Sequence, residues 1–219
     1  MIHTTPTGNS IPETTGRMIH WAGRYDLFTR LLLLGQEPAL REATVAMAGI
    51  NPGDNVLDVG CGTGSLTLAA KRRVGAPGQV HGIDAAPEMI EVAKRKTAQA
   101  RADVTFQVGL IEHIPFPDNA FDVVLSSLML HHLPDDLKQK GFAEICRVLR
   151  PGGRFFAVDF DPSSRSTMER VVTHLVGHGM VEHGIGELQP MLKNAGFMNT
   201  EAGKTSISLF GFVRGSKAE

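Results

Sequence analysis

Residues 55–64 read NVLDVGCGTG, a short apolar run followed by three glycines at alternate positions. The glycines allow a sharp turn whose backbone can lie against a flat ligand, because glycine has no Cβ. Ser65 then provides a good N-cap, and the apolar residues after it recur at helical spacing. The segment therefore predicts a strand, a glycine turn and a helix, the first unit of a nucleotide-binding α/β fold. Asp58, within the apolar run, distinguishes it from an ordinary dinucleotide site.

A second acidic residue ends the next predicted strand. Asp84 follows the apolar run 80–83 and lies 24 positions after Gly60. Pro87 then opens a predicted helix, because proline is tolerated at the first helical position. An acid about 20 residues after such glycines is placed to accept hydrogen bonds from both hydroxyls of a ribose. The spacing favours this role for Asp84 over that of an ordinary solvated carboxylate.

Predicted strands alternate with predicted helices along the chain. This order predicts an α/β fold with a Rossmann-like, doubly wound, mostly parallel seven-stranded sheet that is covered on both faces. The last two strands have no helix between them, so we expect an antiparallel C-terminal hairpin that turns at residues 203–204. Asp135 is expected to cap the helix before the fifth strand. The strands are expected to begin near Asn55 and to include residues 80–83, 104–108, 122–126, 154–160, 199–204 and 205–213.

The N-terminal region precedes this predicted sheet. Residues 1–16 are rich in Thr and Pro, lack the order of a signal peptide and are expected to form a flexible arm. Residues 17–219 are expected to form a single domain, because they contain neither a repeat nor an internal linker. Within that domain, residues 17–49 read as apolar helices. They form either part of the ordinary core or an N-terminal helical lid that closes over a substrate.

Composition restricts the class of protein. A chain of 219 residues with 42% hydrophobic and 21% charged residues predicts one ordinary soluble domain. The formal net charge of −1 gives no global basic footprint for nucleic acid, and no apolar run approaches the ~20 residues of a membrane span. Cys61 and Cys146 do not suggest a disulfide framework, which favours a reducing cytoplasm. We therefore expect a cytoplasmic protein without nucleic-acid partners or stable membrane insertion, while its oligomeric state, homodimer included, stays open.

Five motifs in order resemble the class I S-adenosylmethionine-dependent methyltransferases. Within that family the chain is most similar to the ubiquinone and menaquinone C-methyltransferase branch. The resemblance covers residues 20–215, and its specificity comes from the order and spacing of motifs that are individually modest. The motifs are VLDVGCGTG at 56–64, GID at 82–84, PFPDNAFD at 115–122, LHHL at 130–133 and LRPGGR at 149–154.

The resemblance implies S-adenosyl-L-methionine as cofactor. It implies that Asp58 helps to orient the methionine end, that Asp84 grips the ribose and that residues 109–111 border adenine. In such folds the ligand lies across the carboxyl ends of the strands, so the loops that begin near 60, 84, 109, 126 and 159 should form the site. The candidate cofactor contacts are Tyr25, Asp58, Gly60, Cys61, Gly62, Gly64, Asp84, Ala85, Met89, Leu110, Ile111 and Ser126.

Leu110 departs from the family pattern. Relatives commonly carry an Asp in this segment, as Gly-Asp-Ala, whereas this chain has Gly109-Leu110-Ile111. Leucine cannot accept a hydrogen bond from the adenine amino group. We therefore expect adenine to be held by backbone groups and by apolar contact, with Ile111 and Met89 as walls for the ring.

Two histidines are the candidates for catalysis. Methyl transfer mainly requires alignment of the nucleophile with the methyl group, and a base is needed only when the acceptor must lose a proton. His131 and His132 follow the fourth predicted strand, and a neutral imidazole suits that role near neutral pH. The alternative is that both side chains only shape the pocket. His174, His178 and His183 could share a helix face, but a polar surface explains them better than a metal site, so we expect no metal.

The leading hypothesis is an S-adenosyl-L-methionine-dependent methyltransferase that acts on a small, largely apolar acceptor. A nicotinamide-dependent dehydrogenase is disfavoured by Asp58 and by the closing hairpin. A non-catalytic S-adenosylmethionine-binding regulatory protein is a further alternative, suggested by Leu110. The acceptor atom, whether carbon, oxygen, nitrogen or sulfur, stays open because these chemistries share one scaffold.

Overall fold

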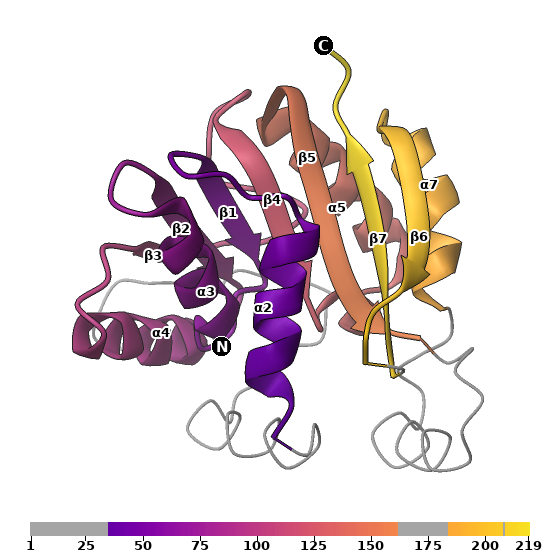
Figure 1. The fold of residues 1–219 in the computed structure, drawn as a ribbon. Helices are drawn as coiled ribbons and strands as arrows, with labels where there is room; N and C mark the ends of the chain where they lie inside the picture. Colours follow the sequence, from indigo (N-terminus) through magenta and orange to yellow (C-terminus); the bar gives the residue numbers. More distant parts are fainter. Residues whose placement is uncertain (1–34, 162–183, 208) are drawn as a thin grey trace, which may run out of the picture.

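One seven-stranded sheet organises the protein (Figure 1). The computed structural model describes residues 35–161, 184–207 and 209–219. The strands follow the order β3-β2-β1-β4-β5-β7-β6, in which β1 to β5 are parallel and β7 runs antiparallel to both of its neighbours. They are β1 Asn55–Val59, β2 Gln79–Asp84, β3 Thr105–Val108, β4 Phe121–Ser127, β5 Leu149–Phe160, β6 Met198–Lys204 and β7 Phe210–Ser216. The expected mostly parallel sheet with a closing antiparallel hairpin is confirmed.

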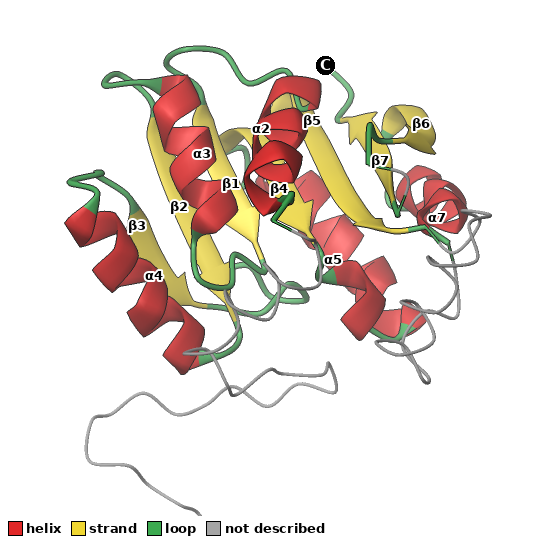
Figure 2. Ribbon diagram, turned by 60° about the horizontal axis from the view of Figure 1, so that its bottom comes forward, coloured by secondary structure: helices red, strands yellow, loops and turns green. Residues whose placement is uncertain are grey.

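Helices cover both faces of this sheet. Helices α2, α3 and α4 lie over one face, while α5 and α7 lie over the other (Figure 2). The helices are α2 Glu37–Met47, α3 Ser65–Val74, α4 Pro87–Gln99, α5 Asp135–Val148 and α7 Leu188–Asn194, with 3-10 turns η1 Leu130–His132 and η2 Ile185–Glu187. This arrangement is the doubly wound fold that the alternation of strands and helices predicts.

Strand β4 contributes side chains to the hydrophobic cores on both faces of the sheet. Val123 and Leu125 face α2 and α3, whereas Val124, between them, faces α5. All three are completely buried, and full burial of such a side chain contributes ~1.5–3 kcal/mol. A parallel strand in the middle of a sheet is covered on both sides, so the central residues of β4 form a continuous apolar run and do not alternate with polar ones.

The strand order creates a topological switch point between β1 and β4. The chain proceeds from β1 to β2 on one side, and β4 occupies the other side of β1. Both strands are parallel, so the loops at their carboxyl ends diverge and leave a crevice between them. The glycine turn after β1 and the short turn η1 after β4 therefore lie at the same edge.

Several expected boundaries are wrong. Gly64, with φ +78°, occupies the N-cap of α3, and Ser65 is the first helical residue. Asp135 is likewise the first residue of α5, after Pro134 at the N-cap. Neither glycine nor proline has a side-chain acceptor, so neither helix has a side-chain cap.

The closing hairpin also turns later than expected. Strand β6 ends at Lys204, and β7 begins at Phe210. Gly203 lies within β6, where a Cβ would come within 2.7 Å of a ring carbon of Phe212. This glycine makes room for an aromatic neighbour and does not mark the turn. Strand β5 begins earlier than expected, at Leu149, and pairs there with Phe121.

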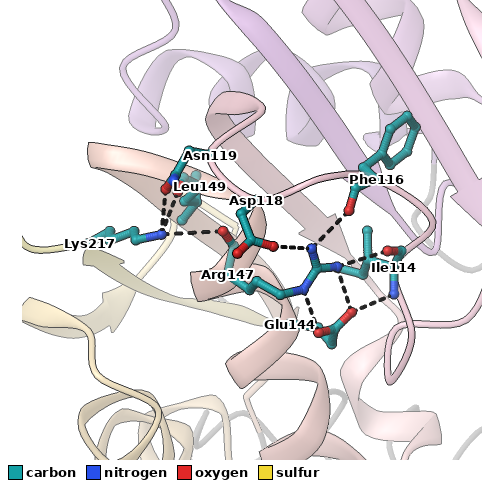
Figure 3. Close-up of polar contacts among 8 residues, drawn as sticks. All are labelled: Ile114, Phe116, Asp118, Asn119, Glu144, Arg147, Leu149 and Lys217. Atoms are coloured by element: carbon teal, nitrogen blue, oxygen red, sulfur yellow. Dashed lines mark hydrogen bonds and ion pairs between the residues drawn. The ribbon is translucent and has the colours of Figure 1, made fainter.

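A polar network around Arg147 lies at the edge of the sheet where β4 and β5 begin, opposite the carboxyl ends of the strands (Figure 3). Its guanidinium donates to both carboxylate oxygens of Glu144, at 2.7 and 2.8 Å, and to the carbonyl oxygens of Ile114 and Phe116, each at 2.9 Å. It also donates to Asp118 Oδ1 at 2.8 Å. The network thus fastens the connection before β4 to the last turns of α5.

Lys217 extends the same network to the end of the chain. Its ammonium group donates to Asn119 Oδ1 and to the Leu149 carbonyl, both at 2.8 Å, as Figure 3 shows. It also donates to the Arg147 carbonyl at 3.2 Å. The C-terminal residues are therefore tied to the start of β5, far from the carboxyl ends of the strands.

The Arg147–Glu144 pair should make stability depend on pH. Hydrogen bonds from Arg147 lower the pKa of Glu144 below its ordinary value of 4.5. A depressed folded-state pKa contributes stability above the unfolded-state pKa and loses it as pH falls through the folded-state pKa. We expect Glu144→Gln to lower the free energy of unfolding by about 1–2 kcal/mol at pH 7, measured in urea, and the deficit to shrink below pH ~4.

Glu42→Gln is the matched control. Glu42 pairs with Arg72 at 2.8 Å, but both side chains are more than half exposed, so this substitution should change stability little. A Glu144→Gln deficit of the same size at pH 7 and at pH 3 would contradict the assigned role.

Candidate functional site

The glycine turn after β1 has a backbone that only glycine adopts readily. Gly60, Gly62 and Gly64 have φ values of +71°, +52° and +78°. A Cβ on Gly60 would also collide with the side chain of Met129, which follows β4. The backbone N–H groups of Gly60 and Cys61 both donate to the Ile83 carbonyl at 2.9 Å. The turn is therefore fixed by the strands on both sides of β1.

Asp84 joins this turn to the beginning of α4. Its Oδ2 accepts a hydrogen bond from Gly62 N–H, and its Oδ1 accepts one from Ala86 N–H, each at 2.9 Å. A carboxylate has about four acceptor positions, so these two bonds leave capacity for a ligand hydroxyl on each oxygen. Burial raises the pKa of Asp84, against the effect of the two backbone hydrogen bonds. The geometry suits recognition of a diol such as a ribose.

Asp58 lies beneath the turn and is 1% exposed. Its carboxylate accepts a hydrogen bond from Thr67 Oγ1 of α3 at 2.6 Å. Burial raises the pKa of Asp58 to about 6, while Thr67 and the charge of Arg41 act in the opposite direction. A buried carboxylate of this kind gains from a nearby cation, because the cation offsets the cost of removing the charge from water.

A narrow cleft lies above Asp58, between the glycine turn, α2 and the end of β4. Its lining combines the turn backbone, one carboxylate, one guanidinium and three hydroxyl side chains. The lining residues are Arg41, Asp58, Gly60, Cys61, Gly62, Thr63, Ser65, Leu66 and Ser127. The cleft can therefore bind a small group that carries charges of both signs.

His131 is held by Asp159 from the end of β5. His131 Nδ1 lies 2.6 Å from Asp159 Oδ1, and the His131 backbone N–H donates to Asp159 Oδ2 at 3.1 Å. Phe160 N–H also donates to this carboxylate, at 2.8 Å. Burial alone would raise the pKa of Asp159, but the His131 imidazole and these hydrogen bonds bring that pKa below its usual value. An ionised Asp159 accepts the proton on Nδ1 and leaves Nε2 of a neutral imidazole as the acceptor.

The end of β4 completes this edge of the site. The rings of His131 and His132 lie with their centroids 3.9 Å apart. Ser126 is buried, and its Oγ has no hydrogen-bond partner among the described residues. Buried hydroxyl groups are normally paired, so Ser126 is an acceptor or donor that a ligand could satisfy.

Other predicted contacts are turned toward the protein core. Cys61 packs against α4 and β3, and burial raises the pKa of its thiol well above the ordinary value, so it fills space and is not a reactive thiolate. Met89 is 3% exposed, and the side chain of Ile111 packs against Gly141 of α5. Contact with adenine at these positions would therefore rely on backbone groups more than on flat side-chain walls.

Leu110 and Ala85 remain accessible at the same edge. Both are half-buried, and Leu110 forms an isolated bridge with His113. Ala85 lies between Asp84 and the Ala86 N–H that binds it. The glycine turn, the end of β2 and the loop after β3 thus lie at one edge of the sheet. This is the edge at which the sequence predicts a ligand that contains a nucleoside.

Some predicted residues lie outside the described part of the chain. Tyr25 and the segment 17–34 are among them, as are His174, His178 and His183. The described remainder of the expected lid is α2, whose Leu40 and Val45 are buried in the core against the sheet. Within the described ranges, no group of three potential ligands could hold a metal ion, and no helix is long and apolar enough to cross a membrane.

Arg41 and Thr67 were not identified from the sequence, and Asp159 was placed at the site only as part of a loop, without a partner. Arg41 lies in an ordinary amphipathic helix, Thr67 lies in the first turn of α3, and Asp159 is the last residue but one of the apolar strand β5. Only Asp159 carries a usable signal, since an acid that ends a buried parallel strand reaches the ligand edge of the sheet.

Comparisons with known proteins relate the chain to methyltransferase domains. Residues 56–153 match a family described as a methyltransferase domain. A solved S-adenosylmethionine-dependent methyltransferase from Aquifex aeolicus superposes with a TM-score of 0.70 and 25% identity, over 89% of this chain and 96% of that one. The relationship to class I S-adenosylmethionine-dependent methyltransferases is thus confirmed.

Curated relatives place the chain near the quinone-modifying branch. The ubiquinone/menaquinone biosynthesis C-methyltransferase of Francisella tularensis is 37% identical over 141 residues, which cover 64% of this chain and 56% of the relative. The demethylmenaquinone methyltransferase of Symbiobacterium thermophilum is 36% identical over 140 residues, 63% of this chain and 55% of the relative. The matched segment thus spans about half the length of these relatives, and the predicted resemblance to this branch is confirmed.

Asp84 should contribute strongly to cofactor binding. We expect Asp84→Asn to weaken the binding of S-adenosylmethionine about 10- to 100-fold in calorimetric titration, because a hydrogen bond to a charged group contributes ~1.5–3 kcal/mol. The amide oxygen that replaces the carboxylate could still accept a hydrogen bond from the backbone N–H of Gly62 or Ala86, so the fold should persist. Glu91→Gln, on the exposed side of α4, is the control and should bind as the wild type does. An unchanged dissociation constant for Asp84→Asn would remove the ribose assignment.

Proposed function

We propose that this protein is an S-adenosyl-L-methionine-dependent methyltransferase that acts on a small, largely apolar acceptor. The arrangement of Asp84 supports this proposal most directly. Its carboxylate is oriented by two backbone N–H groups, beside a cleft that contains Asp58 and the glycine turn. This combination fits a ligand with a ribose and an amino-acid end but without a phosphate. When bound, such a cofactor supplies a methyl group activated by the positive charge of its sulfur.

Each part of the cofactor has candidate residues in this chain. The ribose hydroxyls would donate to Asp84, and Asp58 would favour the cationic centres. The adenine ring would rest against the segment that contains Leu110 and Ile111, through backbone groups, because a leucine side chain cannot pair with an amino group. Removal of water from this edge strengthens each of these electrostatic contacts.

The acceptor would lie near the end of β4, beside His131. An Asp–His pair is a common way to orient an imidazole for proton abstraction, because the carboxylate fixes the tautomer and the ring plane. The side chains of His131 and Asp159 are only 7% and 4% exposed, so their geometry is well defined. We propose His131 as the base for acceptors that must lose a proton, with His132 shaping the pocket.

The proposed acceptor class follows from the relatives. The Francisella and Symbiobacterium proteins are named for methylation in ubiquinone and menaquinone biosynthesis. A quinone precursor carries an apolar tail, and methylation at ring carbon removes a proton from the acceptor. Both properties agree with a base held in a site of low exposure, so a quinol or phenol is the first acceptor to test.

The two alternatives make different predictions. A nicotinamide-dependent dehydrogenase would have a sheet of six parallel strands, whereas here the antiparallel β7 lies between β5 and β6. A non-catalytic cofactor-binding protein would bind S-adenosylmethionine without turnover. Release of S-adenosylhomocysteine with quinols, phenols and thiols as acceptors separates binding from catalysis, and binding with no release across the panel would favour the regulatory alternative.

The Asp159–His131 pair provides a test of base catalysis. We expect His131→Ala and Asp159→Asn each to lower turnover about 10²-fold or more with a phenol or quinol acceptor, since proton transfer contributes about that factor. Cofactor affinity should change little, because neither side chain lines the cleft above Asp58. Turnover and calorimetric affinity are measured on the same preparations. Near-normal turnover in both variants would make the pair structural and favour an acceptor that needs no base, such as a thiolate.

A further inference from the structure

Met129 lies against the glycine turn at the carboxyl edge of the sheet. A Cβ on Gly60 would lie 2.4 Å from Cγ, 2.9 Å from Cβ and 3.2 Å from Cε of Met129, so the methionine side chain lies along this glycine. Gly60 also lines the narrow cleft above Asp58. Met129 is half-buried, so part of its side chain is accessible at this edge. The methionine thus contacts the turn that would hold the cofactor, two positions before His131.

The residues on both sides of Met129 hold it in this position. Leu128 belongs to the core beneath α2 and α3, whereas Leu130 belongs to the core beneath α5. These leucines are 7% and 1% exposed. The chain therefore passes over the edge of the sheet at Met129, and it is anchored on both faces. The Met129 carbonyl also accepts a hydrogen bond from His132 N–H at 3.0 Å, which fixes its backbone to the turn η1.

The backbone of Leu128 makes this crossing possible. Leu125 and Leu128 would face opposite sides of a regular strand, because they are three positions apart, yet both belong to the core beneath α2 and α3. Leu128 interrupts the alternation with a left-handed backbone, at φ +57°. This conformation is unfavourable for leucine and persists only where the surrounding structure fixes it. Here the Leu128 N–H donates to the Val158 carbonyl at 2.9 Å, so the position of Met129 is determined by the fold.

We infer that Met129 limits the size of the acceptor that can reach the methyl group. This inference rests on the proposed function, in which the cofactor lies along the glycine turn and the acceptor lies beside His131. A side chain fixed against Gly60, two positions before His131, would lie between these two ligands. A substituent next to the reacting atom of the acceptor would therefore meet the thioether. If Met129 instead only fills the space over Gly60, its truncation would affect small and large acceptors alike.

The chemistry of methionine fits this role. Its side chain is apolar, flexible and polarizable, so it can adapt to an apolar ring while it still excludes a bulky group. In an apolar pocket, a single methylene changes kcat/KM about 10- to 200-fold. Replacement by alanine removes everything beyond Cβ, so the effect on a bulky acceptor should be easy to measure.

Three pairs of acceptors that differ only in bulk test this role. They are methyl- and tert-butylhydroquinone, ortho-methyl- and ortho-tert-butylphenol, and the corresponding thiophenols. The measured quantity is the ratio of kcat/KM for the bulky member to kcat/KM for the small member, from release of S-adenosylhomocysteine. We expect Met129→Ala to raise this ratio about 10-fold or more, and Met129→Phe to lower it by a similar factor, for each pair that the wild type methylates. Met129→Leu, of similar volume, should change it less than about 3-fold.

Met191→Ala is the matched control. Met191 is also a half-buried methionine that packs against the core beneath α5, but it lies on α7, over β6 and β7. Its truncation should leave the ratio unchanged. A structural effect of losing a methionine would lower kcat/KM for both members of a pair, so the ratio separates size selection from a loss of stability.

The outcomes are distinct. A ratio for Met129→Ala within about 3-fold of the wild-type ratio overturns the size assignment and leaves the proposed function in place. If Met129→Ala lacks a cooperative thermal transition, Met129→Phe decides, and an unchanged ratio in that variant overturns the assignment. Failure of the wild-type protein to methylate any of the acceptors overturns the proposed function and this inference together.

Discussion

The hydrogen bonds between Asp84 and two backbone N–H groups are the interaction on which the site depends. Asp84 ends β2, Gly62 belongs to the turn after β1, and Ala86 precedes α4, so one carboxylate sets the relative position of three segments. Gly60 and Cys61 add their bonds to the Ile83 carbonyl one residue earlier. A ribose at Asp84 would therefore meet an acceptor that is already oriented. Orientation before binding reduces the conformational entropy that the protein loses when a ligand binds.

The two edges of the sheet show different uses of polar groups. At the amino edge, Arg147 donates to five acceptors of the protein and Lys217 to three, so these cations are satisfied by the fold itself. At the carboxyl edge, Ser126 Oγ and Arg41 Nε are buried without a partner in the described structure. Arg147 and Arg41 each pair with a glutamate of their own helix, Glu144 and Glu37. They differ in that Arg41 keeps one N–H group without an acceptor among the described residues. Ser126 and Arg41 lie where the topology places a ligand, whereas Arg154, whose Nε is also unpaired among the described residues, lies beside Asp54 at the amino edge.

The sequence predicted elements whose signals are local. The glycine turn, the strand that ends at Asp84 and Pro87 at the start of α4 each depend on a few neighbouring residues, and the structure has all three where they were predicted. The turn of the closing hairpin was misplaced because Gly203 serves a contact with Phe212, on the neighbouring strand. Arg41 was given no role, and Asp159 no partner, for the same reason. Their partners, Ser127 and His131, are 86 and 28 positions away, and only the strand order brings them together.

Asp58 connects the fold to the chemistry of the site. A buried carboxylate in the first strand is unfavourable for folding alone, and its raised pKa of about 6 expresses that cost. Thr67 offsets part of the cost through a hydrogen bond of 2.6 Å, and Arg41 offsets part through its charge. Binding of a cation beside Asp58 would offset more, so the same burial that destabilises the free protein strengthens its preference for a positively charged ligand.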